Sequence, residues 1–290
     1  MVALGPLVGT EWLATNLGAP DLRIFDATVF LHPNPEGGGY RVESGRDRFR
    51  EGHIPGAVFV DLVEELSAPA SRLPFTMPPP ELAAKKLGAA GIGADSRVVA
   101  YSTGSVMWAT RLWWMLRSLG FDRAAVLDGG FAKWVREGHP VTREVSTYPP
   151  ANMPISPRAS LWADLSEMRP VAAEGRPCTI NALSPEVYRG EKNVYGRPGH
   201  IPKSHNVFYD SLLDPESGTF RRIAELRERF ASTGALASSR VITYCGGGIS
   251  ATMDALALTL LGHANVAVYD GSMSEWVRHP ELPLTLGSEP

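Results

Sequence analysis

A six-residue stretch occurs twice in this chain, first as Ser96-Arg97-Val98-Val99-Ala100-Tyr101 and again as Ser239-Arg240-Val241-Ile242-Thr243-Tyr244. The copies are separated by 239 − 96 = 143 residues. In each copy four apolar or β-branched residues follow one another without alternation, which is typical of a strand buried on both faces. The stretch predicts a strand of a parallel sheet, and its recurrence predicts two such sheets.

Three further pairs of segments recur in the same order at nearly the same spacing. They are 52–55 with 199–202 (199 − 52 = 147), 119–120 with 261–262 (261 − 119 = 142), and 127–130 with 269–272 (269 − 127 = 142). Ordered anchors at a nearly constant offset indicate an internal repeat. The chain is therefore interpreted as a tandem duplication.

The length of 290 residues also suits two domains of about 100–200 residues each. A proline-rich segment near 143–158 separates the copies. Proline disfavours helix and favours extended backbone, so this segment is expected to be a semi-rigid linker. We expect domains at 1–145 and 158–290.

Within each copy, short strand-like runs alternate with longer helical ones. Strands are expected at 98–101, 124–127, 241–244 and 266–269, and helices at 108–119 and 250–261. Strand–helix–strand repetition implies right-handed βαβ units. The predicted fold class is α/β, with two tandem domains, each a parallel sheet that has helices on both faces.

Composition narrows the class of protein. A net charge of −3, with 44% hydrophobic and 20% charged residues, is ordinary for a soluble protein and gives no basic surface for nucleic acid. No apolar run reaches the ~18–20 residues of a membrane span. Two cysteines suit a reducing compartment, and the segment 1–18 lacks the basic start of a signal peptide. We expect a cytoplasmic enzyme or binding protein that binds neither membrane nor nucleic acid.

The two copies differ directly after the shared strand. The first copy continues with Ser102, whereas the second continues with Cys245, Gly246, Gly247, Gly248, Ile249 and Ser250. Cys245 is thus expected at the carboxyl end of a parallel strand and just before a helix, where α/β sheets usually bind ligands.

The three glycines allow the backbone to curl so that several N–H groups point inward, which forms an anion-binding nest. A helix terminus alone stabilises an anion by roughly 0.3–1 kcal/mol, and each hydrogen bond to a charged group adds about 1.5–3 kcal/mol. The loop 246–250 and the helix together are therefore expected to stabilise a Cys245 thiolate and then its persulfide.

Other chemically suggestive residues have simpler interpretations. Cys178 has no glycine loop and is interpreted as structural. His53 and His200 are interpreted as turn residues, and no metal site is predicted because further ligands at metal-binding spacing are missing. Asp128 and Asp270 precede glycine and indicate turns, although Asp270 lies near the expected site. The tryptophans Trp113, Trp114, Trp134 and Trp276 are expected in the core.

The segments 52–57 (GHIPGA), 127–134 (LDGGFAKW) and 244–251 (YCGGGISA) together resemble the tandem-domain rhodaneses, a family that includes thiosulfate and 3-mercaptopyruvate sulfurtransferases. The resemblance covers nearly the whole chain. It implies a catalytically silent N-terminal domain and an active C-terminal domain with its site at the domain interface. Cys245 would be the nucleophile that carries sulfur as a persulfide.

The resemblance also implies the reaction partners. The donor would be a small molecule, thiosulfate or 3-mercaptopyruvate, and the acceptor would be cyanide, a small thiol or a thioredoxin-like protein. No cofactor is implied. Thiosulfate-type members carry basic residues directly after the cysteine, where this chain has Gly246 and Gly247. The loop is more similar to that of the mercaptopyruvate type, which usually has serine at position 247 and threonine at position 250.

The chain departs from the family pattern before the loop. Active domains carry an Asp-x-Arg stretch and then a further arginine that binds the donor's carboxylate, whereas this chain has Asn181, Leu183 and Val187. Because arginine binds carboxylates in bidentate fashion, Arg189 and Arg197 are hypothesised to replace the family arginine.

Two other functions compete with sulfur transfer. A cysteine-dependent phosphatase would need an arginine in the loop to hold phosphate, and 246–252 contains none. A rhodanese-like binding module without catalysis is favoured by the missing arginine at position 187 and disfavoured by the retained cysteine and glycine loop. A thiosulfate-specific rhodanese is the remaining alternative within the family.

Overall fold

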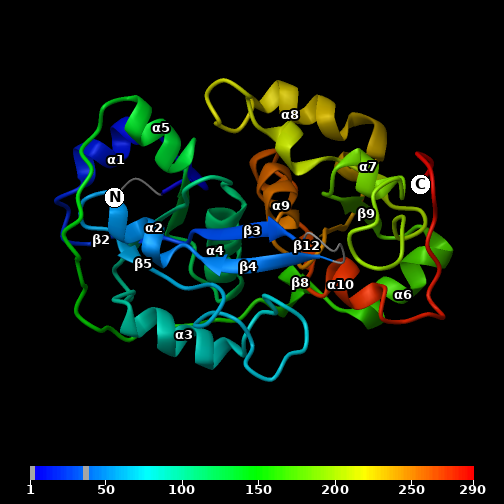
Figure 1. Cartoon of the computed structure of the whole chain (residues 1–290), viewed down its shortest axis with the longest axis horizontal. Coiled ribbons are helices and arrows are strands. Elements are labelled where there is room, and N and C mark those ends of the chain that lie inside the picture. Colours follow the sequence, from blue (N-terminus) through cyan, green and yellow to red (C-terminus); the bar gives the residue numbers. More distant parts are fainter. Residues whose placement is uncertain (1–3, 35–38) are drawn as a thin grey trace.

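The computed structural model of the protein describes residues 4–34 and 39–290, so the first three residues of the N-terminal segment considered above lie outside it. The chain forms two lobes, with the first half of the sequence in one lobe and the second half in the other (Figure 1). Each lobe contains one five-stranded parallel sheet. The predicted α/β class with two domains is confirmed.

The first sheet has the strand order β1-β7-β6-β2-β5. Its strands are β1 (Leu7–Val8), β2 (Leu22–Asp26), β5 (Val58–Phe59), β6 (Arg97–Tyr101) and β7 (Ala124–Leu127). The helices of this domain are α1 (Thr10–Asn16), α2 (Arg46–Glu51), α3 (Pro80–Ala89), α4 (Met107–Ser118) and α5 (Gly130–Arg136).

The second sheet has the strand order β10-β9-β11-β12-β8. Read from the β8 edge, this is the same order as in the first sheet, with β8, β12, β11, β9 and β10 in the places of β1, β7, β6, β2 and β5. Its strands are β8 (Trp162–Ala163), β9 (Cys178–Asn181), β10 (His205–Asn206), β11 (Val241–Tyr244) and β12 (Val266–Tyr269). The α-helices are α6 (Leu165–Glu174), α7 (Pro185–Tyr188), α8 (Ile223–Phe230), α9 (Ala251–Leu260) and α10 (Ser272–Trp276). Short 3₁₀ turns lie at η1 (Ala159–Leu161), η2 (Tyr209–Leu212), η3 (Ala231–Thr233) and η4 (Ala235–Ala237).

Each sheet is covered on both faces, which explains why its central strands are mostly apolar. In the first domain, α1 and α5 pack through Leu13 and Trp134 on one face, and α3 and α4 cover the other. In the second domain, α6 and α10 pack on one face through Met168 and Trp276, and α8 and α9 cover the other. All four tryptophans expected in the core are buried.

The two domains meet along helices α4 and α9. The hydroxyls of Thr110 and Thr252 form a 2.7 Å hydrogen bond between these helices. Their positions differ by 252 − 110 = 142, the repeat offset, so equivalent residues touch at this point. The apolar cluster around α4 and α9 is continuous across both domains. The interface is therefore core-like.

The segment 143–158 contains no helix or strand, as predicted, but it does not span free space between the domains. The N–H groups of Ala151 and Ser156 donate to the carbonyls of Gly88 and Leu119, at 2.8 Å each. Tyr148 Oη donates to Gly56 O at 2.7 Å. The linker is therefore docked on the first domain.

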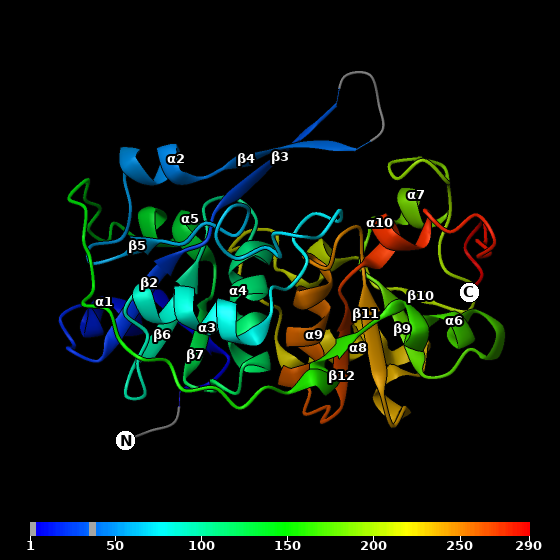
Figure 2. The same cartoon turned by 90° about the horizontal axis from the view of Figure 1, so that it is seen from below.

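An antiparallel hairpin, formed by β3 (Val29–Pro33) and β4 (Tyr40–Ser44), projects from the first domain toward the second (Figure 2). It has no counterpart among the elements of the second domain that the structure describes. The hairpin brings side chains of the first domain to the end of β11. No helix among the described residues is long and apolar enough to cross a membrane.

Candidate active site

A cavity of about 520 Å³ lies where the domains meet, and Cys245 is in its wall. Residues from both domains contribute to the lining. Leu31, Tyr40, Val42, Pro74, Phe75 and Met107 come from the first domain, and Leu183, Val194, Tyr195, Tyr209, Cys245, Ser250, Ser274 and Arg278 come from the second. The cavity is thus a mainly apolar space with a few hydroxyl groups and a guanidinium group.

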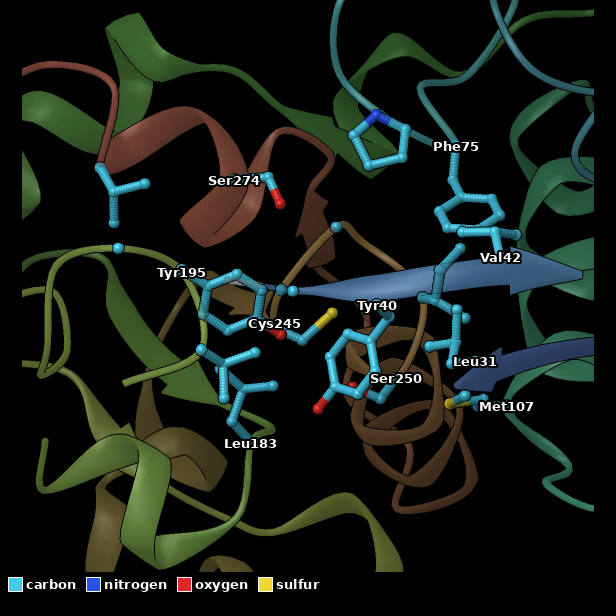
Figure 3. A pocket seen from close by; sticks show the side chains of 18 of the residues that line it. Leu31, Tyr40, Val42, Phe75, Met107, Leu183, Tyr195, Cys245, Ser250 and Ser274 are labelled. Atoms are coloured by element: carbon cyan, nitrogen blue, oxygen red, sulfur yellow. The ribbon is translucent and has the colours of Figure 1, made fainter. Parts of the chain in front are cut away.

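Cys245 directly follows β11, the central strand of the second sheet. Its side chain projects into the cavity, with Tyr195 and Leu183 on one side and Leu31, Val42 and Phe75 on the other (Figure 3). Only 2% of the residue is exposed. A nucleophile at this place is shielded from bulk water and faces the space where a small molecule would bind.

The carbonyl groups of Cys245, Gly246 and Gly248 accept hydrogen bonds from other elements. Met273 N–H donates to Cys245 O at 3.0 Å and Ser274 N–H to Gly246 O at 2.8 Å, both from the start of α10. Arg111, from α4 of the first domain, donates through Nη1 to Gly248 O at 3.1 Å. These contacts fix the orientation of the peptide groups in the loop.

The N–H groups of the loop fall into two sets. Those of Cys245 and Gly248 donate to Ser272 Oγ at 3.1 Å each, which anchors the loop to α10. Among the described residues, the N–H groups at positions 246, 247, 249 and 250 have no acceptor. Because they precede α9, they join the positive end of its dipole. They are unpaired donors in the loop 246–250 that directly follows Cys245.

The three glycines have different surroundings. A Cβ atom on Gly246 would collide with Tyr195 Oη. Gly248 has φ +72, and a Cβ atom there would lie 2.8 Å from Asp270 O, so both conformation and space require glycine. A Cβ atom on Gly247 would have its nearest neighbour, Pro74 O, at 3.8 Å. Position 247 therefore has room for a side chain.

Two tyrosine hydroxyls near Cys245 are held in the neutral form. Burial, together with the negative charge of a Cys245 thiolate, raises the pKa of Tyr195. The pKa of Tyr209 is raised mainly by burial, with smaller contributions that include Asp210 and Cys245. Protonated hydroxyls are hydrogen-bond donors, so the cavity can donate to an oxygen atom of a bound molecule without using a cation.

Neither arginine that the sequence suggested for substrate binding lines the cavity. Arg189 forms a two-point contact with Glu191, at 2.7 and 2.9 Å. Arg197 donates to the carbonyls of His279 and Leu282 at 2.9 and 2.8 Å, where it supports the chain after α10. The guanidinium group that lines the cavity belongs to Arg278, which lies 81 residues further along the chain than Arg197.

The positions where the family pattern would have acidic and basic residues form an apolar wall. Leu183 lines the cavity and Val187 is buried. Asn181 is fully buried, and its Oδ1 accepts from Leu183 N–H at 2.8 Å, which shapes the turn after β9. This wall offers no charge to a substrate.

One carboxyl group near the site has no partner. Asp254, on α9, is 0% exposed, and neither of its oxygens has a hydrogen-bond partner among the described residues. Burial, and to a smaller extent the nearby Cys245, raise the pKa of Asp254 well above 3.8. Nothing in its surroundings explains this residue.

The other candidates have structural surroundings. Cys178 begins β9, its thiol donates to Thr233 O at 3.4 Å, and burial raises its pKa to about 11. His53 stacks on Phe49 with 3.8 Å between ring centroids, and His200 stacks on Tyr188 with 3.6 Å between ring centroids. Both imidazole rings also contact backbone carbonyls. The surroundings of all three residues are structural, and all three lie outside the cavity lining.

Several site residues were missed by the sequence interpretation. Arg278, Ser274, Tyr195 and Tyr209 lie in segments with no motif, and the first-domain residues Tyr40 and Phe75 reach the cavity only through the domain interface. The recurrence of 127–130 as 269–272 is the one signal that points to the α10 region, because it places Asp270 and Ser272 near the loop. The arrangement can bind a small molecule against a thiol and stabilise a negative charge on sulfur.

Comparison with known proteins agrees with this architecture. The model of the rhodanese-like domain matches residues 9–137 and 187–279. The 3-mercaptopyruvate sulfurtransferase of Escherichia coli is 32% identical over 96% of both chains. The thiosulfate sulfurtransferase of Rattus norvegicus is 34% identical over 97% of this chain and 95% of its own length.

A solved structure shows the same arrangement of domains. The crystal structure of the 3-mercaptopyruvate sulfotransferase SseA from Escherichia coli aligns with a TM-score of 0.81 at 29% identity, covering 93% of this chain and 99% of that one. With two matched rhodanese-like domains and relatives similar over nearly the whole length, this chain belongs to the rhodanese family as a tandem-domain sulfurtransferase.

Proposed function

We propose that this sulfurtransferase moves sulfur through a persulfide on Cys245 and takes it from a small mercapto-carboxylate donor, with 3-mercaptopyruvate preferred over thiosulfate. One observation carries the proposal. Cys245, followed by a loop whose N–H groups at positions 246, 247, 249 and 250 have no acceptor among the described residues, lines a cavity whose wall is almost without charge. The first domain is proposed to lack catalysis of its own, because its loop has Ser102, which donates to Ser105 O at 2.8 Å and is buried.

In the first half-reaction the Cys245 thiolate attacks the sulfur of the donor. A sulfur–sulfur bond forms, the donor's carbon–sulfur bond breaks, and its electron pair leaves on carbon as the enolate of pyruvate. The proton that the donor thiol carried ends on that carbon, which gives pyruvate and a Cys245 persulfide anion. This is nucleophilic catalysis, in which the loop N–H groups stabilise the sulfur anion before and after transfer.

The charge of the cavity favours this donor over thiosulfate. A dianion that enters an apolar space must be matched by cations, because an unpaired buried charge is very unfavourable. Arg278 is the only cationic residue among the described residues that line the cavity, and its guanidinium group also donates to Arg72 O at 3.2 Å. One guanidinium group suits one carboxylate, and a neutral tyrosine hydroxyl suits the keto oxygen on which enolate charge develops.

In the second half-reaction an acceptor removes the outer sulfur. Cyanide, a small thiol or a thioredoxin-like protein attacks the outer sulfur atom, the sulfur–sulfur bond breaks, and its electron pair returns to Cys245 as the thiolate. The enzyme is then regenerated without a net change in oxidation state.

The proposal is tested by measuring thiocyanate formation from cyanide with each donor, in the wild type, Cys245→Ser and Arg278→Met. We expect turnover with 3-mercaptopyruvate that disappears in Cys245→Ser. In Arg278→Met we expect KM for 3-mercaptopyruvate to rise by up to about fivefold, because Arg278 is exposed and a solvent-screened ion pair of about 0.2–1 kcal/mol is lost.

Arg197→Met serves as the matched control, because Arg197 binds backbone carbonyls outside the cavity lining. An equal rise of KM in both arginine variants would remove Arg278 from the proposal. Better turnover with thiosulfate would overturn the donor assignment, and the absence of Cys245-dependent turnover with either donor would favour a binding module.

A further inference from the structure

We propose that Arg111, a residue of the first domain, is a positioning residue for the catalytic loop of the second domain. This inference rests on the proposed function, because the proposed function assigns the loop 245–250 to catalysis. Arg111 is fully buried at 1% exposure and extends from α4 across the domain interface. Its guanidinium group lies over the ring of Trp162, with 4.7 Å between Cζ and the ring centroid.

The guanidinium group joins three parts of the site. Nη1 donates to Gly248 O at 3.1 Å and to Asp270 Oδ1 at 2.7 Å. Nη2 donates to Phe75 O. The acceptors belong to the catalytic loop, to the turn before α10, and to the cavity wall from the first domain. A planar group with donors in fixed directions can satisfy all three, whereas a lysine ammonium is a single point on a flexible stem.

The contact with Gly248 bears on the chemistry of the loop. Holding the carbonyl of Gly248 toward Arg111 fixes the peptide that joins it to Ile249, and the N–H of Ile249 is among those left for an anion at Cys245. Gly248 fits so closely that a Cβ atom there would lie 3.2 Å from Arg111 Nη1. Arg111 therefore sets the direction of a donor group that the reaction uses.

The contact with Phe75 shapes the cavity wall. Phe75 has φ +60, a conformation that bulky side chains rarely adopt, and its ring lines the cavity. Unusual backbone geometry persists where surrounding contacts hold it. The Arg111 contact to Phe75 O, with the donation from Met77 N–H to Asp270 Oδ2 at 2.7 Å, ties this segment to the second domain.

Comparison of the two copies separates this contact from ordinary interface packing. The aspartate contacts are symmetric, since Asp270 accepts from Met77 N–H and Asp128, at the equivalent position, accepts from Phe220 N–H at 2.8 Å. The arginine is not symmetric. With Thr110 opposite Thr252, the residue equivalent to Arg111 is the buried Met253 (253 − 111 = 142). The first domain thus contacts the loop of the second through the guanidinium group of Arg111, whereas the equivalent residue of the second domain, Met253, has no such group.

The test compares Arg111→Lys and Arg111→Met with the same substitutions at Arg117, a second arginine of α4. Arg117 lies near Trp113 and Asp122, and within the described part of the chain its guanidinium group forms no hydrogen bond or ion pair with the loop, which makes it a matched control. Two quantities are measured in each full-length variant: amide hydrogen exchange of the peptide that covers 245–250, and kcat and KM for 3-mercaptopyruvate.

We expect Arg111→Lys to fold, to exchange the loop amides at least about tenfold faster than wild type, and to lose about 10–100-fold in kcat with a smaller change in KM, because displaced catalytic groups cost rate. The Arg117 variants should match wild type in both. If Arg111→Met does not fold, the test rests on Arg111→Lys. Asp270→Asn, which removes the charge of the carboxylate that binds Arg111, should also exchange the loop amides faster.

Unchanged loop exchange in folded Arg111→Lys would overturn the inference, as would an equal increase in Arg117→Lys. Hydrogen exchange also separates the two proposals. If the wild type shows no Cys245-dependent turnover, the proposed function fails, while the exchange of the loop still reports whether Arg111 holds it.

Discussion

Each glycine after Cys245 has its own physical role. Gly246 makes room for the Tyr195 hydroxyl, and Gly248 adopts a left-handed conformation beside Asp270 and Arg111. Gly247 has no close neighbour and faces Pro74 and Phe75 at the cavity wall. A side chain at position 247 can therefore change what the cavity binds without displacing the loop.

We predict that Gly247→Lys improves the use of thiosulfate. The added ammonium group would lie in the cavity beside Cys245, and a charge-assisted contact with a dianion, worth about 1.5–3 kcal/mol, should raise kcat/KM for thiosulfate about tenfold or more. Steady-state rates with thiosulfate and cyanide measure this. Gly247→Met is the control, since it has similar length and no charge. A similar gain in Gly247→Met, or no gain in Gly247→Lys, would contradict a role for charge in donor choice.

At the scale of elements, much of the fold follows from sequence periodicity. The strands expected at 124–127, 241–244 and 266–269 are observed with the same bounds, because short buried runs end abruptly at turn residues. The helices expected at 108–119 and 250–261 are observed as α4 (Met107–Ser118) and α9 (Ala251–Leu260). The β3–β4 hairpin was not predicted. Its contribution to the cavity could not be predicted from sequence patterns either, because it depends on the packing of the two domains.

Comparison of α4 with α9 shows that the position of Asp254 is occupied by a leucine in the first copy. Since Thr110 meets Thr252, the equivalent of Asp254 is Leu112 (254 − 112 = 142), and both are fully buried. We predict that Asp254→Leu stabilises the protein by about 1–3 kcal/mol near neutral pH, because an unpaired buried carboxyl group is removed. The mirror variant Leu112→Asp should lose stability by creating such a group in the first domain.

This gain should depend on pH. The folded state raises the pKa of Asp254 above 3.8, so between 3.8 and the raised value the unfolded chain releases a proton that the folded protein keeps. The wild type therefore loses stability as pH rises through this window, and the variant does not. Urea unfolding at about pH 4 and about pH 8 measures the difference in free energy of unfolding between wild type and variant. An advantage of the variant that shrinks with rising pH would contradict the assignment.

At the scale of the molecule, the two copies form one structural unit. The apolar cluster runs from Trp108 and Leu112 in α4 to Leu256 in α9, and polar contacts at Asp128 and Asp270 cross the interface in both directions. The cavity includes residues as distant in sequence as Leu31 and Arg278. Local patterns point to Cys245 and its loop, but the hypothesis about Arg189 and Arg197 considers only arginines that are close in sequence. The arginine that lines the cavity is Arg278, which lies just after α10.

We predict a single unfolding transition for the whole chain. Five of the seven tryptophans lie in the first domain, and both cysteines lie in the second. Tryptophan fluorescence and the exposure of Cys178 to a thiol reagent therefore report different domains. Because the apolar cluster is shared, both probes should show the same midpoint in urea. Separate midpoints would mean that the domains unfold independently.

The claim that Cys245 carries the transferred sulfur is tested most directly by mass spectrometry of the enzyme after incubation with 3-mercaptopyruvate in the absence of an acceptor. Our account predicts one additional sulfur atom on the peptide that contains Cys245, none on the peptide that contains Cys178, and loss of that sulfur when cyanide is added. Pyruvate release without sulfur on Cys245, or sulfur on Cys178 in its place, would contradict it.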